Sequence, residues 1–260
     1  MYIMIIKGVS MLKQERWMKI AQLCQQKDRV TVEELVETLH VSPATIRRDL
    51  QQMEDESLIV RYHGGAKSKE NLLEEPSMII KNVSNVDPKR HIACYAASLI
   101  RDNQMIYIDA GSTTLLILQY ITAKNITVVT PGVPHLTLLG ERGISTIVLG
   151  GTLRWSTQAI TGRQAVRQLG EMYFDECFVG TNGIHSQVGF TTSNEMEAET
   201  KALAIHHAKK AYVLADHSKF NILCPVHFAD LKEAMIICDT VEDFDTSLID
   251  YACVCGQQGD

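Results

Sequence analysis

The sequence predicts an α/β protein in which a small, mostly helical N-terminal domain precedes a larger, Rossmann-like α/β domain with a mostly parallel sheet. Three observations support this prediction. Apolar residues recur at helical spacing through residues 15–53. From residue 87 onward, short apolar runs alternate with helical segments, as in α/β folds. The 260 residues, of which 45% are apolar and only six are proline, are enough to bury two hydrophobic cores.

The cysteines carry no pattern of a metal site. There are seven, and only Cys253 and Cys255 lie close together. That spacing is not the spacing of a zinc finger, and no second pair completes a site, so we expect neither metal nor cofactor. Met1 to Ile6 is too short for a secretory leader, and no apolar run is long enough to cross a bilayer. We therefore expect reduced thiols in a cytoplasmic protein without a membrane partner.

The charge is divided unevenly along the chain. The formal net charge is −6, which is unusual for a protein that binds nucleic acid. Residues 1–69 hold 11 Lys and Arg against 9 Asp and Glu, whereas residues 70–260 hold 14 against 22. The excess of acid therefore lies in the larger domain, and any affinity for DNA must come from a local basic face.

The first helices are predicted by their caps and their apolar spacing. Residues 15–26 place Trp17, Ile20 and Leu23 on one helical face. Thr31-Val32-Glu33-Glu34 is a capping box, in which Thr31 caps forward and Glu34 reaches back. The helix that it opens turns Leu35, Val36 and Leu39 inward. His40-Val41 is then a very short turn, so these helices form a helix-turn-helix.

The second helix of this motif has two different faces. Ser42 is the expected N-cap and Pro43 falls at the first helical position. Ile46, Leu50 and Met53 form the apolar stripe. The other face carries small residues early and two arginines later, a pattern that suits a DNA major groove. For an isolated helix, a solvated surface with two arginines would explain the same pattern.

A wing follows this helix. Leu58 to Tyr62 alternates as a strand, and His63-Gly64-Gly65-Ala66 lets the chain double back. Arg61, His63, Lys67 and Lys69 gather there and can meet phosphates.

These residues resemble the winged helix-turn-helix of DeoR-type bacterial transcription regulators over residues 13–69. The matching runs are Val32-Glu33-Glu34-Leu35, the stretch from Val41 to Leu50, and the stretch from Arg61 to Ala66. The resemblance implies that double-stranded operator DNA is a partner and that the protein is a homo-oligomer, a dimer or tetramer. The residues that we predict to face DNA are Thr31, Ser42, Ala44, Thr45, Arg47, Arg48, Gln51, Arg61 and His63.

A polar linker at residues 70–86 separates this domain from a second one at residues 87–255. Met78-Ile79-Ile80 within the linker is expected to pack on one of the domains. Asp87 and Pro88 are expected to cap and begin the next helix. Buried strands are expected at residues 105–108, 126–129, 146–149, 176–179, 211–214 and 234–237.

Ligands bind beyond the carboxyl ends of the strands in such sheets. After the first strand comes Asp109-Ala110-Gly111-Ser112-Thr113-Thr114, and a helix over residues 115–121 follows. Backbone N–H groups, hydroxyls and the positive end of the helix dipole suit a phosphate there. An ordinary Ser/Thr cap after a strand is an equally good explanation of this turn taken alone.

Other strand ends carry glycines that allow close approach and polar groups that suit a sugar phosphate. Glu195, Glu197, Glu199 and Lys201 lie on or before a helix expected to run to Lys209. Each residue also has an ordinary explanation as a turn glycine or a solvated side chain, and only their meeting at one sheet edge indicates a site. The predicted effector-binding residues are Asp109, Gly111, Ser112, Thr113, Thr114, Gly150, Gly151, Gly180, Asn182, Gly183, Lys201, Asp216 and Lys219.

Residues 87–240 also resemble the effector domain of DeoR-type regulators. The matching runs are Ile108 to Thr114, Leu149-Gly150-Gly151, Phe178 to Ile184 and Asp216 to Phe220. The resemblance implies a fold similar to ribose-5-phosphate isomerase and a phosphorylated sugar as effector. Thr130-Pro131-Gly132-Val133 departs from the usual Thr-Asn, and Lys81 and His91 stand where the family has other basic residues.

Two classes of function remain open. The first is a transcription regulator, a repressor of a carbohydrate-utilisation operon that responds to a phosphorylated sugar or to an effector of another kind. The second is an isomerase-like phosphosugar enzyme, with Asp109, Glu195 or Asp216 as base and Lys201 or Lys219 as electrostatic partner. The helix-turn-helix favours the regulator, because an isomerase has no use for it, and no catalytic residue is predicted.

Overall fold

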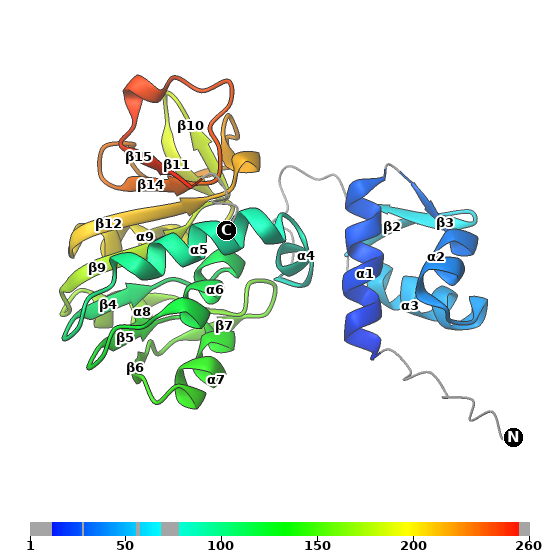
Figure 1. Cartoon of the computed structure of the whole chain (residues 1–260), viewed down its shortest axis with the longest axis horizontal. Coiled ribbons are helices and arrows are strands. Elements are labelled where there is room, and N and C mark those ends of the chain that lie inside the picture. The colour runs from blue at the N-terminus through cyan, green and yellow to red at the C-terminus, as the bar shows by residue number, and fades with distance from the viewer. Residues whose placement is uncertain (1–11, 28, 56–57, 69–77, 255–260) are drawn as a thin grey trace, which may run out of the picture. The chain divides into compact units, whose positions relative to one another are not determined.

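The computed structural model describes residues 12–27, 29–55, 58–68 and 78–254, and these divide into two compact units. The first unit comprises the described residues up to 68 together with 79–84. The second comprises Met78 and the described residues from 85 onward (Figure 1). Among the described residues, no helix has both the length and the apolar character that crossing a membrane requires.

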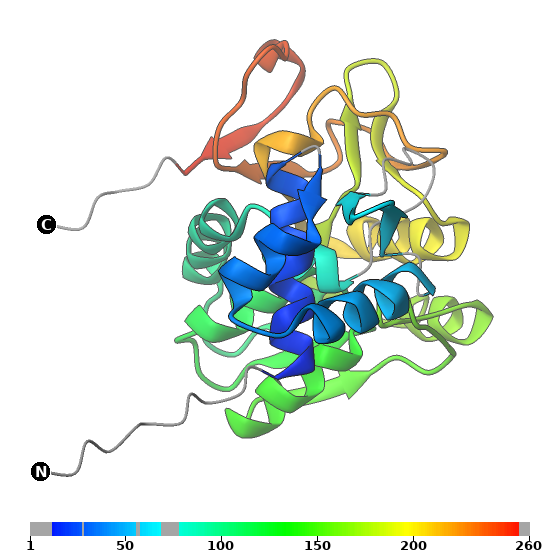
Figure 2. The same cartoon turned by 90° about the vertical axis from the view of Figure 1, so that its right-hand side faces the viewer.

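The first unit is a winged helix-turn-helix. Figure 2 faces this unit and shows α1 (blue) crossed by the helices that follow it. The wing strands pair in the order β1-β3-β2. The elements are α1 (Lys13–Gln26), β1 (Val30–Thr31), α2 (Val32–Leu39), α3 (Pro43–Asp55), β2 (Ile59–Tyr62) and β3 (Gly65–Ser68).

The caps predicted for α2 and α3 are confirmed. The Thr31 hydroxyl accepts from the Glu34 backbone N–H at 3.2 Å, and the Glu34 carboxylate accepts from the Thr31 N–H at 2.8 Å. His40 takes the left-handed conformation (φ 54°) that ends α2 in a tight turn. The Ser42 hydroxyl then accepts from the Thr45 N–H at 3.2 Å, which caps α3.

One buried carboxylate ties α1 to α3. Asp49, only 2% exposed, accepts from Arg16 Nε at 2.7 Å and Nη2 at 3.2 Å, and from Trp17 Nε1 at 3.2 Å. The hydrogen bond to Asp49 raises the pKa of the Arg16 guanidinium. Around this pair lies an apolar core in which Ile46 and Leu50 are almost fully buried. The apolar stripe predicted on α3, formed by Ile46, Leu50 and Met53, therefore packs into this core.

The second unit is built on a parallel sheet in the order β15-β14-β12-β9-β4-β5-β6, in which every neighbouring pair runs parallel. This confirms the predicted α/β class. The edge strand β15 was not predicted. The strands are β4 (Met105–Ile108), β5 (Thr127–Thr130), β6 (Ser145–Val148), β9 (Phe174–Gly180), β12 (Ala208–Ala215), β14 (Met235–Cys238) and β15 (Tyr251–Cys253).

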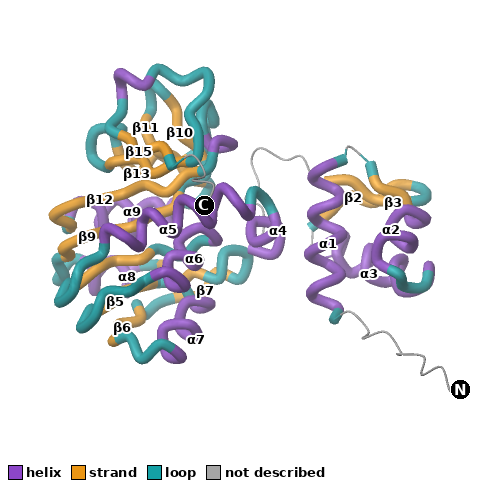
Figure 3. Tube along the Cα trace, in the orientation of Figure 1, coloured by secondary structure: helices purple, strands orange, loops and turns teal. Residues whose placement is uncertain are grey.

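Helices cover both faces of this sheet, as Figures 1 and 3 show. Alternate strand residues supply the two cores: Ile106 and Ile108 pack toward one set of helices, and Tyr107 packs toward the other. Parallel strands buried on both faces read as continuous apolar runs, which is why the sequence showed them. The first set is α5 (Val86–Leu99), α6 (Ser112–Tyr120) and α7 (Val133–Glu141), and the second is α8 (Arg163–Leu169) and α9 (Glu195–His206).

Short strands form two further sheets that the sequence did not predict. The hairpin of β7 (Thr152–Arg154) and β8 (Ala159–Thr161) is one. The other contains β10 (Gly183–His185), β11 (Gly189–Thr192) and β13 (Val226–Ala229). Strands of three or four residues are too short for alternation to stand out.

Several predicted helix boundaries were wrong. Helix α6 begins at Ser112 and not at Leu115. Helix α5 begins at Val86 and not at Pro88, and its N-cap position is Asn85, so Asp87 is no cap. Helix α9 ends at His206, and Lys209 belongs to β12. Within the predicted linker, Met78–Val83 forms the short helix α4. Met78 is buried, and its N–H donates to the Ser156 carbonyl at 3.0 Å.

Candidate DNA-binding face and effector site

The outer face of α3 is exposed as predicted. Ser42, Ala44, Arg47, Arg48 and Gln51 are exposed, and Thr45 is half-buried. Because Ile46 and Leu50 hold the opposite face in the core, this face keeps a fixed orientation on its unit. An exposed arginine pair on a rigid helix is the arrangement that reads base edges and phosphates in a major groove.

Five of the predicted DNA contacts already have partners within the unit. The Ser42 and Thr45 hydroxyls bond each other at 2.9 Å. Arg61 donates from Nη1 to the Gln51 side-chain oxygen, and its guanidinium lies 3.8 Å from Glu54. Gln51 in turn donates to Asp55 at 2.9 Å. The Thr31 hydroxyl oxygen serves as the α2 cap. His63, by contrast, is exposed at the wing turn.

The predicted site at the carboxyl edge of the large sheet brings Asp109, Gly180 and Lys201 together. Asp109 follows β4 and accepts from the Gly180 N–H at 3.2 Å. Lys201, on α9, donates to the same Asp109 oxygen and to the Gly180 carbonyl at 3.0 Å. The two charged side chains are 6% and 7% exposed, so they form a buried ion pair. Both residues are predicted to bind the effector, and in this structure they bind each other.

The turn after Asp109 leads directly into α6. Ser112 and Thr113 are the first helical residues, whose N–H groups have no partner within the helix. Thr114 is fully buried, and its hydroxyl donates to the Asp109 carbonyl at 2.6 Å. Thr114 therefore shapes the turn, and the anion-binding capacity lies in the backbone and in the two residues before it.

Glu197 extends this cluster and was missed as a site residue. It is 7% exposed, accepts from the Thr157 hydroxyl at 2.6 Å and lies 3.9 Å from Arg154. Glu197 stands one helical turn before Lys201 on α9. Thr157 comes from the β7–β8 turn, whose strands are too short to be predicted from the sequence, so this contact could not be predicted either.

Asp216, at the end of β12, is a second buried carboxylate of this edge. It is 2% exposed and accepts from Asn85 Nδ2 at 2.9 Å, from the Ser218 N–H at 3.1 Å and from the Ser218 hydroxyl at 2.5 Å. Burial raises the pKa of Asp216, but the charges of Lys219 and Lys89 and the hydrogen bonds from Ser218 and Asn85 together outweigh burial and leave the pKa below its ordinary value. Asn85 was not predicted as a partner.

Several predicted glycines have structural reasons of their own. A Cβ on Gly151, which has φ +150°, would lie 2.4 Å from the Thr161 carbonyl oxygen, and one on Gly183 would lie 2.4 Å from the Ile222 carbonyl oxygen. The Gly150 N–H donates to the Gln168 side chain at 2.6 Å. A Cβ on Gly180 would meet only the Asp109 carboxylate, at 4.0 Å. Of these four, Gly180 is the one whose own backbone bonds to the ion pair, through its N–H to Asp109 and its carbonyl to Lys201.

Other polar residues at this edge are held by the protein itself. Asn182 donates to the Ser193 hydroxyl at 3.2 Å. His135, near the start of α7, is fully buried, and neither ring nitrogen makes a hydrogen bond to a described residue. Burial lowers the pKa of His135 to about 4, against a smaller opposing effect of the Asp109 backbone. Among the described residues, no cluster of His, Cys, Asp and Glu could hold a metal ion.

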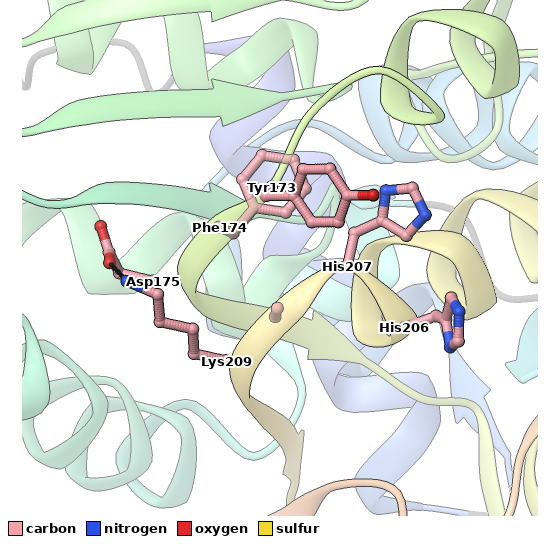
Figure 4. A pocket seen from close by; sticks show the side chains of 7 residues that line it. Tyr173, Phe174, Asp175, His206, His207 and Lys209 are labelled. Atoms are coloured by element: carbon pink, nitrogen blue, oxygen red, sulfur yellow. Dashed lines mark hydrogen bonds and ion pairs between the residues drawn. The ribbon is translucent and has the colours of Figure 1, made fainter.

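A cavity of about 410 Å³ lies at the opposite, amino end of β9 and β12. Figure 4 shows Tyr173 beside His207 there, with Lys209 bonded to Asp175 at 2.7 Å. The Tyr173 and His207 rings stack with centroids 4.8 Å apart. No predicted site residue lines this cavity.

A winged helix-turn-helix with an exposed arginine pair on one unit and a polar sheet edge on the other are the features of a DNA-binding transcription regulator. Residues 16–71 match the DeoR-like helix-turn-helix domain, and residues 84–240 match the DeoR C terminal sensor domain. The chain belongs to the DeoR family of transcription regulators.

Several transcription regulators are similar to this chain over nearly their whole length. The HTH-type transcriptional regulator FruR of Bacillus subtilis is 40% identical over 234 residues, or 90% of this chain and 93% of that protein. The HTH-type transcriptional regulator GlpR of Haloferax volcanii is 36% identical, over 91% and 93%. The lactose phosphotransferase system repressor of Staphylococcus aureus is 31% identical, over 90% and 94%.

Among solved structures, ribose 5-phosphate isomerase A of Methanocaldococcus jannaschii aligns with a TM-score of 0.38 and 19% identity. It covers 53% of this chain and 55% of that one. A likeness this weak carries no argument about activity.

Proposed function

We propose that this regulator represses a carbohydrate-utilisation operon and that a phosphorylated sugar, bound at the carboxyl edge of the large sheet, modulates its affinity for operator DNA. The observation that carries the proposal is the buried Asp109–Lys201 pair beside the start of α6. The name of the lactose phosphotransferase system repressor, a relative covered over 94% of its length, supports a role in sugar use.

The chemistry of this edge suits a sugar phosphate. The N–H groups of Ser112 and Thr113 and the positive end of the α6 dipole favour a dianion. An anion bound at the start of α6 competes with Asp109 for the Lys201 ammonium, because the start of α6 and the Asp109–Lys201 pair lie at the same edge of the sheet. Release of Lys201 would leave the Asp109 carboxylate to accept hydrogen bonds from sugar hydroxyls. The predicted roles of both residues then belong to the ligand-bound form.

We place DNA on the outer face of α3, with one of Arg47 and Arg48 at a base edge and the other at a phosphate. Use of Arg61 and Gln51 as DNA contacts requires their mutual hydrogen bond to open. We retain residues 13–69, 70–86 and 87–255 as DNA-binding domain, linker and effector domain. A homo-oligomer in the cytoplasm, without catalytic activity, completes the proposal, since repeated half-sites require at least two reading helices.

An isomerase-like activity has less support in the geometry. Asp109 is paired with Lys201, and Asp216 accepts three hydrogen bonds, so neither carboxylate is placed as a base. Glu195 is exposed at the start of α9.

The effector class is tested by titrating the operator complex with a panel of sugar phosphates and matched unphosphorylated sugars. A gel shift measures release of DNA, and a thermal shift measures binding. We expect at least one sugar phosphate to act where its parent sugar does not. Release by the unphosphorylated sugars alone would contradict the proposal.

The position of the phosphate is tested by Ser112→Asp. Aspartate is well tolerated in the first turn of a helix, so the fold should survive, while its charge repels a phosphate. The variant should bind operator normally and lose its response, with Ser145→Asp, on an exposed strand position, as the control. A response at wild-type concentrations would move the phosphate elsewhere.

A further inference from the structure

The short helix α4 is the last element of the chain before the effector domain. The chain leaves the wing at Ser68 and passes through residues 69–77 before it reaches α4. Residues 79–84 group with the first unit, whereas the residues on either side, Met78 and Asn85, group with the second. The two flanks of α4 are therefore the points at which the effector domain holds the chain that leads to the DNA-binding domain.

Asn85 holds the C-terminal flank. It adopts the left-handed conformation (φ 48°, ψ 44°), and its side chain makes no cap hydrogen bond to α5. Instead, Nδ2 donates to Asp216 Oδ1 at 2.9 Å and to the Ser218 hydroxyl at 3.4 Å. Asp216 belongs to the sheet edge at which we place the effector, so this flank is bonded directly to the site.

Met78 holds the N-terminal flank. Its N–H donates to the Ser156 carbonyl at 3.0 Å, and its side chain is 4% exposed. Ser156 lies in the β7–β8 turn, where the next residue, Thr157, donates its hydroxyl to Glu197. Glu197 is one turn from Lys201 on α9. This flank is therefore also joined, through one strand turn, to the groups that surround Asp109.

We propose that Asn85 is a positioning residue that couples occupation of the effector site to the connecting helix α4. The inference rests on the proposed function. The side chain of Asn85 and both donors of Ser218 bond to the same oxygen of Asp216, Oδ1, and an oxygen that already accepts three hydrogen bonds has no room for a fourth donor. A ligand hydroxyl that donates to Oδ1 of Asp216 competes with Asn85 for this oxygen, and loss of the Asn85 bond frees the C-terminal flank of α4. Held flanks correspond to the operator-binding form, and freed flanks correspond to the effector-bound form.

Asn85→Gly tests this directly. Glycine adopts the left-handed conformation without strain, so the substitution removes the side chain and leaves the backbone as it is. Asn103→Gly is the matched control. Asn103 also has a left-handed backbone (φ 63°) and lies in the same unit. It precedes the amino end of β4, whereas Asp216 follows the carboxyl end of β12, so the two residues lie at opposite edges of the parallel sheet.

The first measurement needs no effector. Full-length Asn85→Gly should bind operator about 5- to 150-fold more weakly than wild type, the usual range of coupling between two sites. Its melting temperature should match that of Asn103→Gly, whose operator affinity should be unchanged. Hydrogen exchange of the Met78–Val83 amides should be faster in Asn85→Gly alone. Operator affinity within twofold of wild type, or unchanged exchange in α4, would overturn the inference.

The second measurement separates this inference from the proposed function. With a sugar phosphate that shifts the wild type, the affinity of Asn85→Gly for that ligand should be the same with and without operator, because coupling is reciprocal. A full wild-type response in Asn85→Gly would reject the role of Asn85 and leave the proposed effector intact. If no sugar phosphate acts on the wild type, but Asn85→Gly still weakens operator binding, the effector class fails and the role of Asn85 stands.

Discussion

Each unit of this regulator contains a buried carboxylate in an ion pair, and the two pairs are built differently. Asp49 in the first unit receives three hydrogen bonds from neighbouring residues of one helix, two from Arg16 and one from Trp17. Asp109 in the second unit receives one from the flexible side chain of Lys201 and one from the Gly180 backbone. A planar guanidinium and an indole fix a carboxylate in place, whereas an ammonium on a four-carbon stem can turn to another anion.

The difference shows that a buried ion pair can either hold two helices together or keep a charged side chain available for another partner. Asp49 clamps α1 onto α3 and so fixes the face of α3 on which we place DNA. Asp109 lies at a sheet edge beside the start of a helix, where an incoming anion can compete for Lys201. Burial alone does not separate the two cases, since the residues are 2% and 4% exposed.

The strongest test of the first unit is Ile46→Asp. Ile46 is fully buried in the helix-turn-helix core, so the substitution buries a carboxylate without a partner. We expect a loss on the order of 5 kcal/mol or more, enough to unfold a small domain. Calorimetry should show the larger unit still melting cooperatively. Ala44→Asp, on the exposed face of the same helix, should keep the fold. A folded Ile46→Asp unit would contradict the core described here.

Asp49→Ala tests the clamp itself. It removes the three hydrogen bonds that Asp49 accepts from Arg16 and Trp17 and breaks a buried ion pair, which should cost about 3–5 kcal/mol. Denaturant unfolding of the first unit measures this loss. Asp55→Ala, an exposed carboxylate on the same helix, is the control and should change little. Equal effects of the two substitutions would show that Asp49 is no clamp.

His135 should make the second unit sensitive to acid. The unfolded chain binds this proton near pH 6.5, but the folded chain binds it only near pH 4. Stability is therefore complete above about pH 6.5 and falls as the pH drops toward 4, by about 3 kcal/mol in all. His135→Leu should remove this dependence in thermal melts between about pH 7 and pH 5, while His91→Leu, an exposed position on α5, should not. The same slope in His135→Leu would assign the acid sensitivity to other groups.

The smallest expected effects concern DNA contacts. Arg47→Ala and Arg48→Ala should each cost about 1–3 kcal/mol of operator binding, because both side chains are exposed and neither supports the core. The base-reading arginine should also lose specificity, and the phosphate-binding one should weaken all sequences alike. Lys124→Ala, exposed on the other unit, is the control. Normal operator binding by the double variant would remove α3 as the reading helix.

Most of the fold could be predicted, because its signals are local. The Thr31 and Ser42 caps, the α3 stripe and the buried strands each depend on neighbouring residues. The hairpin β7–β8 and strand β15 could not, since three-residue strands carry too little periodicity. The start of α5 was misplaced because Asp87-Pro88 imitates a cap, whereas the preceding Asn85 turns its side chain to Asp216.

The candidate site was predicted as a set of strand ends and not as a set of contacts. The topology rule correctly brought Asp109, Gly180 and Lys201 together. It could not foresee that Lys201 binds Asp109, that Thr157 supports Glu197, or that Asn85 reaches Asp216, 131 residues away. Such pairs join distant parts of the chain, and one sequence carries no signal for them.

The order of pairing in the large sheet bears on how the protein is made. Every strand pair of the first unit lies within residues 30–68, whereas the central strand β9 must pair with β4, as in Ile106 with Glu176, and then with β12. Parallel pairing over such separations is slow to form. On the ribosome, the DNA-binding domain should therefore fold while most of the effector domain is still unsynthesised. Proteolysis of stalled nascent chains of increasing length should show protection of the first unit well before that of the sheet. During that interval, the chain would carry a folded DNA-binding domain without a folded effector domain.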